Sequence, residues 1–251
     1  MKKPMKNKLE NNLNILISFR SIDEVSEECL KYVDILDLKD PDKGAIGSWE
    51  INNLKKIICK FGNKIKISAT LGDEEKVYKI LSKLELFDSL KLDYIKFGIF
   101  TNDIKQLNFL LNSIKKKNFK TELVPVIFVE NEFLRNFVKE NIKEFKMFGY
   151  NFLLLDTYSK DLGNIFEICS LDYLRILLEQ SSLNNMDVGL AGKLNISNIS
   201  QLAELQPKIV GFRSAVCEGE NRKKELSVSK LKKLYYSIIS ARRPAIHAAG
   251  A

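Results

Sequence analysis

An acidic and a basic side chain stand two residues apart at the end of one apolar stretch. The segment VDILDLK (33–39) carries Asp37 and Lys39 among residues that are typical of a buried strand. Side chains of a strand alternate between its two faces, so Asp37 and Lys39 share one face. Leu36 and Leu38 take the other face. A carboxylate near an amine is suited to proton transfer, and a neutral lysine amine can attack a carbonyl carbon.

The same alternation predicts where three further charged side chains point. They are Lys96 in DYIKFGIF, Asp156 in FLLLDT and Arg213 in KIVGFRSA, and each lies late in its apolar segment. The residues expected to face outward, against covering helices, are Leu36, Leu38, Ile95, Phe97, Ile99, Val210 and Phe212. The charged side chains would then face one another. Burying unpaired charge is costly, so we expect these groups to be mutually paired.

Eight strand-like segments alternate with connections of helical length. The predicted strands are 14–19, 33–39, 65–71, 93–100, 121–129, 152–157, 187–192 and 208–215. This alternation predicts right-handed βαβ units and a parallel sheet, and eight units in 251 residues predict an α/β fold, a single-domain (βα)8 TIM barrel. An open doubly wound sheet is the alternative, although the chain has neither a GxGxxG fingerprint nor a P-loop. We place the barrel at 13–240, between an N-terminal extension (1–12) and a C-terminal tail (241–251).

Four connections carry helix signals of their own. Ser21 and Glu24 have the spacing of a capping box at a helix start. Gly62 is a helix-stop signal, and acidic residues favour the start of the next helix. The predicted helices span 21–32, 48–62, 73–84 and 227–239.

Charge and hydropathy limit the partners of the chain. The net charge is +8, but the basic residues are mostly lysines spread over every segment, which indicates a solvated surface rather than a nucleic-acid interface. A positive active-site mouth would also suit a phosphorylated metabolite. No segment approaches the roughly 18 consecutive apolar residues of a membrane span, and the start lacks the apolar run of a signal peptide. We therefore expect a cytoplasmic protein that binds neither nucleic acid nor membrane.

Cysteine and histidine are too few and too scattered for a metal centre. Cys29, Cys59, Cys169 and Cys217 lie far apart with no CxxC, and the one histidine is His247 near the end of the chain. Neither a zinc site nor a disulfide framework is expected, and Cys217 is interpreted as structural. Acid–base chemistry would fall to Lys, Asp, Glu or Tyr, with no metal and no cofactor.

The segments after the last two strands suit a phosphate group. Loops in these positions of (βα)8 barrels commonly bind phosphate through glycine N–H groups and a cation. In AGKL the candidates are Gly192 and Lys193, and in GFRSAVCEGENR they are Gly211, Arg213 and Ser214. Ordinary glycine turns are the alternative interpretation.

Several of these motifs occur together in a recognisable order. DILDLKDPDKGAIG, SATLGD, DYIKFG, LLDTYSKD, LAGKL and IVGFRSAVCEG follow one another between about residues 14 and 235. Together they resemble the (5-formylfuran-3-yl)methyl phosphate synthase family of methanofuran biosynthesis, a part of C1 metabolism. The resemblance implies a class I aldolase-like lyase. Such enzymes condense two molecules of glyceraldehyde 3-phosphate into a furan aldehyde phosphate, with loss of one phosphate and water.

The resemblance also implies roles for individual residues. The Schiff-base lysine of the D-x-K motif falls on Lys39 and its partner acid on Asp37. The general acid–base lysine of the D-Y-I-K motif falls on Lys96. The acid and the lysine of the L-D-T-x-x-K motif fall on Asp156 and Lys160. A neutral amine is favoured by burial and by a neighbouring cation, and Lys96 would be that neighbour of Lys39.

The chain departs from the family in its last strand segment. The family usually has R-G-A-A-C-x-G-G-D-R there, whereas this chain has RSAVCEGENR, with Ser214 and Glu220 in place of glycines. These side chains stand where bare backbone would approach phosphate, so they bear on substrate preference. The alternatives are another Schiff-base aldolase for a phosphorylated carbonyl compound and a non-catalytic phosphosugar-binding barrel. We expect a homo-oligomer, of a size that the sequence does not give.

Overall fold

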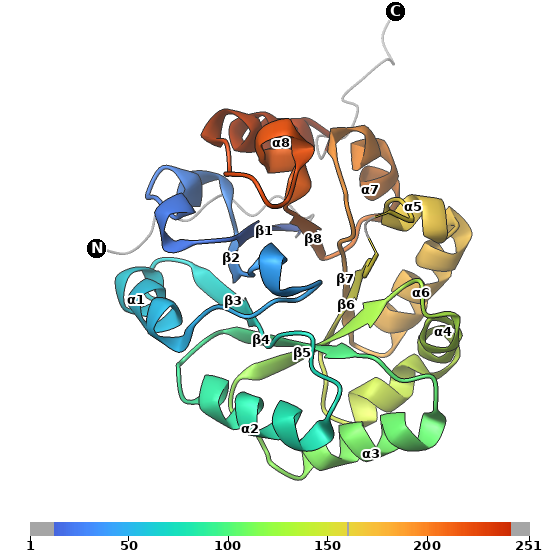
Figure 1. The fold of residues 1–251 in the computed structure, drawn as a ribbon. Helices are drawn as coiled ribbons and strands as arrows, with labels where there is room; N and C mark the ends of the chain where they lie inside the picture. Colours follow the sequence, from blue (N-terminus) through green and yellow to red (C-terminus); the bar gives the residue numbers. More distant parts are fainter. Residues whose placement is uncertain (1–12, 160, 242–251) are drawn as a thin grey trace, which may run out of the picture.

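The computed structural model describes residues 13–159 and 161–241, which form a closed barrel of parallel strands (Figure 1). Each strand pairs with the next along the chain, and β8 pairs with β1 to close the ring. The strands are β1 Asn14–Phe19, β2 Ile35–Leu38, β3 Lys66–Thr70, β4 Tyr94–Ile99, β5 Glu122–Phe128, β6 Phe152–Asp156, β7 Asp187–Leu190 and β8 Ile209–Phe212. The predicted (βα)8 barrel is confirmed, and each strand lies within its predicted segment.

Helices surround the barrel (Figure 1). They are α1 Ile51–Phe61, α2 Val77–Asp88, α3 Ile104–Lys115, α4 Glu132–Met147, α5 Ile165–Ile168, α6 Leu171–Leu183, α7 Ile199–Leu205 and α8 Val228–Ala241. Gly62 follows α1 as predicted, whereas α2 begins only after the acidic residues that were expected to open it. The last helix includes the first residue of the predicted tail, while the rest of the tail and the extension (1–12) lie outside the described residues. Within the described ranges, every helix is too short or too polar to traverse a bilayer.

The helix predicted over 21–32 was wrong. Two short 3-10 turns, η1 (Ile22–Glu24) and η2 (Cys29–Tyr32), connect β1 to β2 instead. The Ser21 side chain makes no capping hydrogen bond within the described chain, and the Glu24 carboxylate accepts hydrogen bonds from the Arg20 backbone and the Arg213 side chain. The Glu24 carboxylate therefore forms a tertiary ion pair with Arg213 instead of a helix-capping hydrogen bond.

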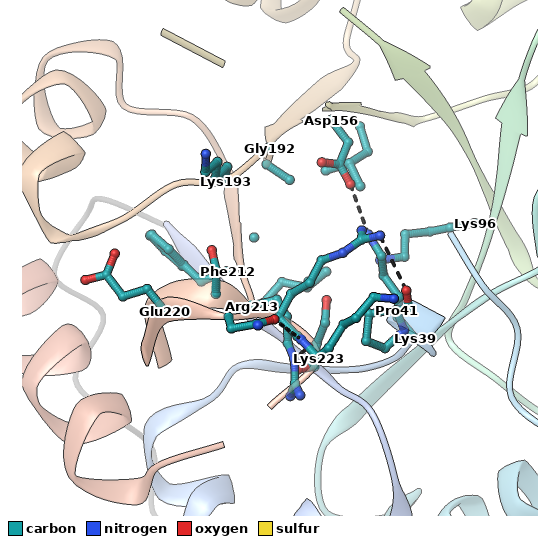
Figure 2. Close-up of a pocket in the computed structure, with 18 residues that line it drawn as sticks. Lys39, Pro41, Lys96, Asp156, Gly192, Lys193, Phe212, Arg213, Glu220 and Lys223 are labelled. Atoms are coloured by element: carbon teal, nitrogen blue, oxygen red, sulfur yellow. Dashed lines mark hydrogen bonds and ion pairs between the residues drawn. The ribbon is translucent and has the colours of Figure 1, made fainter. Parts of the chain in front are cut away.

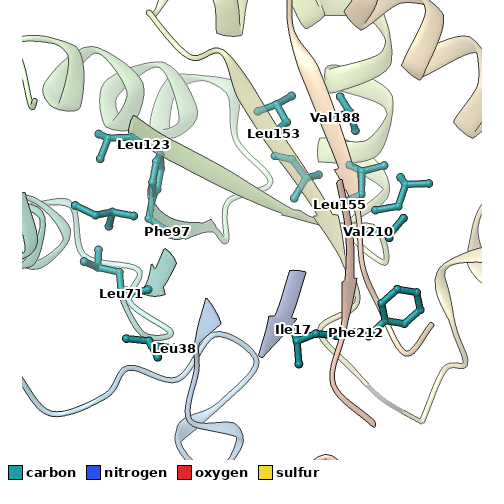
Figure 3. Close-up of a cluster of buried hydrophobic side chains, with 14 of the residues drawn as sticks. Ile17, Leu38, Leu71, Phe97, Leu123, Leu153, Leu155, Val188, Val210 and Phe212 are labelled. Carbon is teal, nitrogen blue, oxygen red and sulfur yellow. The ribbon is translucent and has the colours of Figure 1, made fainter. Parts of the chain in front are cut away.

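The strands have an apolar outer face and a mixed inner face. All of the residues predicted to face outward are buried in one continuous layer between strands and helices (Figure 3). The inner face holds a small apolar cluster of Leu16, Ile35 and Ile209, each early in its strand. Charged and hydroxyl side chains follow later on the same inner face. A second apolar cluster, which includes Ile46, Phe128 and Ala191, lies beside them. The barrel therefore has an apolar floor and a mixed upper chamber, charged on one side and apolar on the other, at the carboxyl ends of the strands.

Candidate active site

A lysine–carboxylate pair occupies the upper barrel interior. Lys96 Nζ of β4 lies 2.5 Å from Asp37 Oδ1 of β2, and both side chains are buried. The strand register sets Ser18, Asp37 and Ser68 side by side on β1, β2 and β3. Ser18 Oγ donates to Asp37 Oδ2 at 2.7 Å, and Ser68 Oγ donates to Oδ1 at 2.5 Å. The carboxylate thus has three partners, which supports its burial.

Burial weakens the hold of Lys96 on its proton. Loss of water lowers the pKa of Lys96 below its ordinary value of 10.5. The Asp37 carboxylate acts in the opposite direction, while the Lys39 cation adds to the lowering. An amine with a lowered pKa can both donate and accept a proton nearer to neutral pH, which suits general acid–base work.

A second lysine–carboxylate pair lies at the carboxyl ends of the strands. Lys39, just after β2, places Nζ 3.2 Å from Asp156 Oδ2 at the end of β6. The other oxygen, Oδ1, accepts a hydrogen bond of 2.7 Å from the Thr157 backbone, which orients the carboxylate. The Lys39 side chain is 12% exposed, so it is accessible from the barrel mouth. Lys39 therefore pairs with the acid across the barrel rather than with Asp37 on its own strand.

The Lys39–Asp156 pair and Lys96 line one cavity of about 350 Å³ (Figure 2). The predicted site residues that line it are Lys39, Lys96, Asp156, Gly192, Lys193, Gly211, Arg213 and Ser214. Asp37 does not line the cavity but contacts Lys96, which does. Lys160, the remaining predicted residue, lies outside the described residues. Residues from opposite ends of the sequence are thereby gathered at one mouth.

The backbone after β7 and β8 forms one wall of the cavity. Gly192 has a φ of 99°, and a Cβ there would lie 2.8 Å from Thr157 Cγ2. Only glycine fits this combination of left-handed backbone and close approach. Lys193 follows with a φ of 53° and lines the cavity together with Ser214. Bare backbone and a cation thus lie together, as phosphate binding requires.

The Arg213 guanidinium is hydrogen-bonded to acceptors of the protein itself. It forms two hydrogen bonds with the Glu24 carboxylate, of 2.7 and 2.9 Å. Its other donors reach the carbonyl oxygens of Ser18, Arg222 and Lys224. All five N–H groups therefore have protein acceptors. Arg213 lines the cavity, but its charge is committed to Glu24 and to the loop that follows β8.

Sequence reasoning missed several residues of this site. Glu24 was interpreted as a helix cap, although it is the buried partner of Arg213. Arg222 and Lys223 line the cavity from the loop after β8, opposite Pro41 of the loop after β2. The run GENRKK in that loop was the available signal, but a loop has no periodicity that predicts side-chain direction.

Cys217 illustrates a buried residue at the base of this loop. Its thiol donates to the Arg213 carbonyl oxygen at 3.1 Å, and burial raises the pKa of Cys217 to about 11. The thiol therefore stays protonated near neutral pH, in agreement with its interpretation as a structural residue.

Fold and site together define a class of protein. A closed (βα)8 barrel with lysines and carboxylates gathered at the carboxyl ends of its strands has the architecture of an enzyme. The chain belongs to the 4-HFC-P synthase family, whose model matches residues 15–235. The family resemblance of the sequence motifs is thereby confirmed.

Relatives of known name agree with this assignment. A chain named (5-formylfuran-3-yl)methyl phosphate synthase from Archaeoglobus fulgidus is 25% identical, over 89% of this chain and 100% of its own length. A chain of the same name from Methanocaldococcus jannaschii is 26% identical, over 83% of this chain and 92% of its own length.

Solved structures show the fold. Phosphoribosyl anthranilate isomerase from Thermus thermophilus superposes with a TM-score of 0.62 at 15% identity, over 91% of this chain and 100% of its own. The 3-hexulose-6-phosphate synthase from Salmonella typhimurium gives 0.59 at 14% identity, over 91% and 99%. At such identities the likeness concerns architecture alone.

Proposed function

We propose that this enzyme condenses two molecules of glyceraldehyde 3-phosphate into (5-formylfuran-3-yl)methyl phosphate, with loss of one phosphate and two molecules of water. The names of the related chains support this product, which would feed methanofuran biosynthesis. The observation that carries the proposal is the contact of Lys39 with Asp156 directly beside the buried Lys96–Asp37 pair. One accessible amine and three supporting ionisable groups are the parts that imine chemistry needs.

Lys39 would be the nucleophile. Its amine adds to the carbonyl carbon of a triose phosphate, and loss of water gives the imine. Asp156, 3.2 Å from the amine, would accept the amine proton and return a proton to the departing hydroxyl. The imine then withdraws electrons from the adjacent carbon, which makes that carbon acidic enough for carbon–carbon bond formation.

Lys96 would move protons during the later steps. Its lowered pKa and its position at the cavity suit proton transfer to and from the carbon chain. Asp37 would hold Lys96 in place, because its own oxygens are fixed by two serine hydroxyls. For Lys160, the proposed role in acid–base chemistry rests on the family motif alone.

Phosphate would be held by the wall after β7 and β8. Gly192 and Gly211 expose backbone there, and Lys193 supplies a cation. Positioning by this wall would present the carbonyl carbon to Lys39. Formation of an aromatic furan after elimination of phosphate and water would draw the sequence forward.

A second candidate is an aldolase for another phosphorylated carbonyl compound. The observation that favours it is Glu220, whose carboxylate-bearing side chain lines the cavity from a backbone with a φ of 54°. A negative charge near a phosphate site would shift the choice of substrate. The two candidates differ in product, since only the first forms a furan chromophore.

Borohydride trapping tests the imine. The protein is incubated with glyceraldehyde 3-phosphate, reduced, digested and analysed by mass spectrometry. We expect a reduced triose adduct on Lys39 and an absorbing furan product in the unreduced reaction. K39M and an exposed-lysine control, K55M, are treated in parallel. An adduct on Lys96 would exchange the roles of the two lysines, and furan formation without any adduct would refute the imine mechanism.

A further inference from the structure

The loop after β8 places a basic side chain, Arg222, against the loop that follows Lys39. Arg222 lines the cavity, and its Nη2 donates to the Pro41 carbonyl oxygen at 3.4 Å. Pro41 lies two residues after Lys39, in the segment that follows β2. The Arg222 guanidinium therefore bridges from the β8 loop to the β2 loop across the mouth of the cavity.

One nitrogen of this guanidinium has no acceptor. Among the described residues, Arg222 Nη1 is buried and makes no hydrogen bond. A buried donor without a partner costs about 1–3 kcal/mol, and more when it carries charge. An acceptor from outside the chain, either water or a ligand, can complete such a group. The unpartnered nitrogen therefore leaves one donor for an acceptor oxygen at the Arg222 side of the cavity.

The neighbouring charges favour an anion. Lys39, Lys96 and Arg213 each have a carboxylate partner, so their charges are already balanced within the protein. Among the described residues, the Arg222 guanidinium has one hydrogen bond, to the Pro41 carbonyl oxygen, and no carboxylate partner. Glu220, an acid of the same loop, lies on the side of the cavity away from Lys39 and Pro41 (Figure 2).

The loop that carries Arg222 is held in place. Arg213 donates to the Arg222 and Lys224 carbonyl oxygens, at 2.9 and 2.8 Å, and its charge is anchored by buried Glu24. The backbone from Arg222 to Lys224 is thus tied to Arg213, just after β8, and through it to Glu24. A fixed cation binds a phosphate group with a smaller loss of conformational entropy than a mobile one.

We propose that Arg222 forms a second phosphate subsite, distinct from the wall of Gly192, Lys193 and Ser214. The inference rests on the proposed function, in which two phosphorylated trioses must share a cavity of about 350 Å³. Two phosphate groups repel each other, so each requires its own donors. The wall after β7 would hold one phosphate, and Arg222 would hold the phosphate of the second triose near Lys39.

Crystals soaked in inorganic phosphate test the subsite directly. The wild-type protein should hold one phosphate at the wall and one on Arg222 Nη1. R222M keeps a long side chain without charge and should retain only the wall phosphate. R222K should bind the second phosphate more weakly. K224M changes an exposed lysine of the same loop and should retain both. A wild-type crystal without phosphate at Arg222, or an R222M crystal that keeps it, would overturn the proposal.

Kinetics give a second readout. Loss of one charge-assisted contact should raise KM for glyceraldehyde 3-phosphate by about 30-fold in R222M. At saturating triose phosphate, R222M should still form the Lys39 adduct, because one bound triose is sufficient for the imine. An unchanged KM would contradict the subsite. If the wild type forms neither furan nor adduct, the proposed function fails, while the soaked crystals still decide whether Arg222 binds phosphate.

Discussion

The cavity has two sides that are built in different ways. The lysine side comes from strands β2, β4 and β6, and its charged residues are Asp37, Lys39, Lys96 and Asp156. The loop side comes from the segments after β7 and β8, and its residues are Gly192, Lys193, Arg213, Ser214 and Arg222. On the lysine side, short contacts join side chains of separate strands. On the loop side, glycine backbone and one anchored loop form the wall.

Under the proposed function, this structural difference separates the residues that react from the residues that bind substrate. Strand residues are fixed by the barrel itself, so the reactive groups can be held to the tolerance that proton transfer requires. Loop residues can change without disturbing the barrel, and the departures at Ser214 and Glu220 from the family pattern both fall there. We therefore expect substitutions on the two sides to have different kinetic signatures.

Removal of the amine on the lysine side should have the largest effect. K39M should lower kcat by roughly 10⁴-fold or more, because no other step can replace the imine. The barrel should remain folded, since Lys39 lies after β2 and is partly exposed. Furan formation and circular dichroism are measured on the same preparation. Near-normal turnover in folded K39M would remove the proposed distinction between the two sides.

Breaking the anchor of the loop side should have an intermediate effect. E24Q leaves Arg213, with a side chain only 9% exposed, without its carboxylate partner. We expect a loss of about 3 kcal/mol in the free energy of unfolding, measured by urea denaturation. KM for triose phosphate should rise more than kcat falls, because the loop that carries Arg222 loses its anchor.

A matched control uses an exposed carboxylate of the same segment. Glu27 pairs with Lys64 at the surface, and both side chains are more than half exposed. E27Q should change the free energy of unfolding by less than about 0.5 kcal/mol. Equal losses in E24Q and E27Q would show that the buried pair does not anchor the loop.

The smallest effect concerns pH. The folded protein holds the pKa of Lys96 below 10.5, so between these two values the unfolded chain binds more protons. The contribution of Lys96 to the free energy of unfolding should therefore rise as pH rises through its folded pKa towards 10.5. Side-chain NMR, with K96M for assignment, should show Lys96 titrating below the surface lysines. Titration together with them would contradict the burial argument.

Strand alternation made the lysine side predictable. The apolar partners of Asp37, Lys96 and Asp156 fixed which face each charge would take, and the structure places all three at the upper interior. The loop side was predictable only in part. Gly192 was found through its place after a strand, but the direction of the Arg213 guanidinium was not, because Glu24 comes from a distant segment.

Local signals failed where tertiary contacts were stronger. The segment 21–32 has a capping spacing and an amphipathic pattern, yet it forms only 3-10 turns. Its acid Glu24 accepts hydrogen bonds from Arg213 and from the Leu226 backbone, both near the other end of the chain. No window of neighbouring residues contains those donors. For Arg222 the signal was equally distant, since its guanidinium contacts the Pro41 carbonyl oxygen.

The Glu24–Arg213 ion pair bears on whether the loop after β8 is ordered before substrate binds. The segment after β8 is held by hydrogen bonds of Arg213 to Glu24, in the first third of the chain, and to the Lys224 carbonyl oxygen, in the last third. The loop after β8 is therefore ordered before substrate binds. The conformational entropy of ordering this loop does not oppose substrate binding. Under the proposed function, the cavity therefore has its shape for two phosphate groups as soon as the barrel has folded.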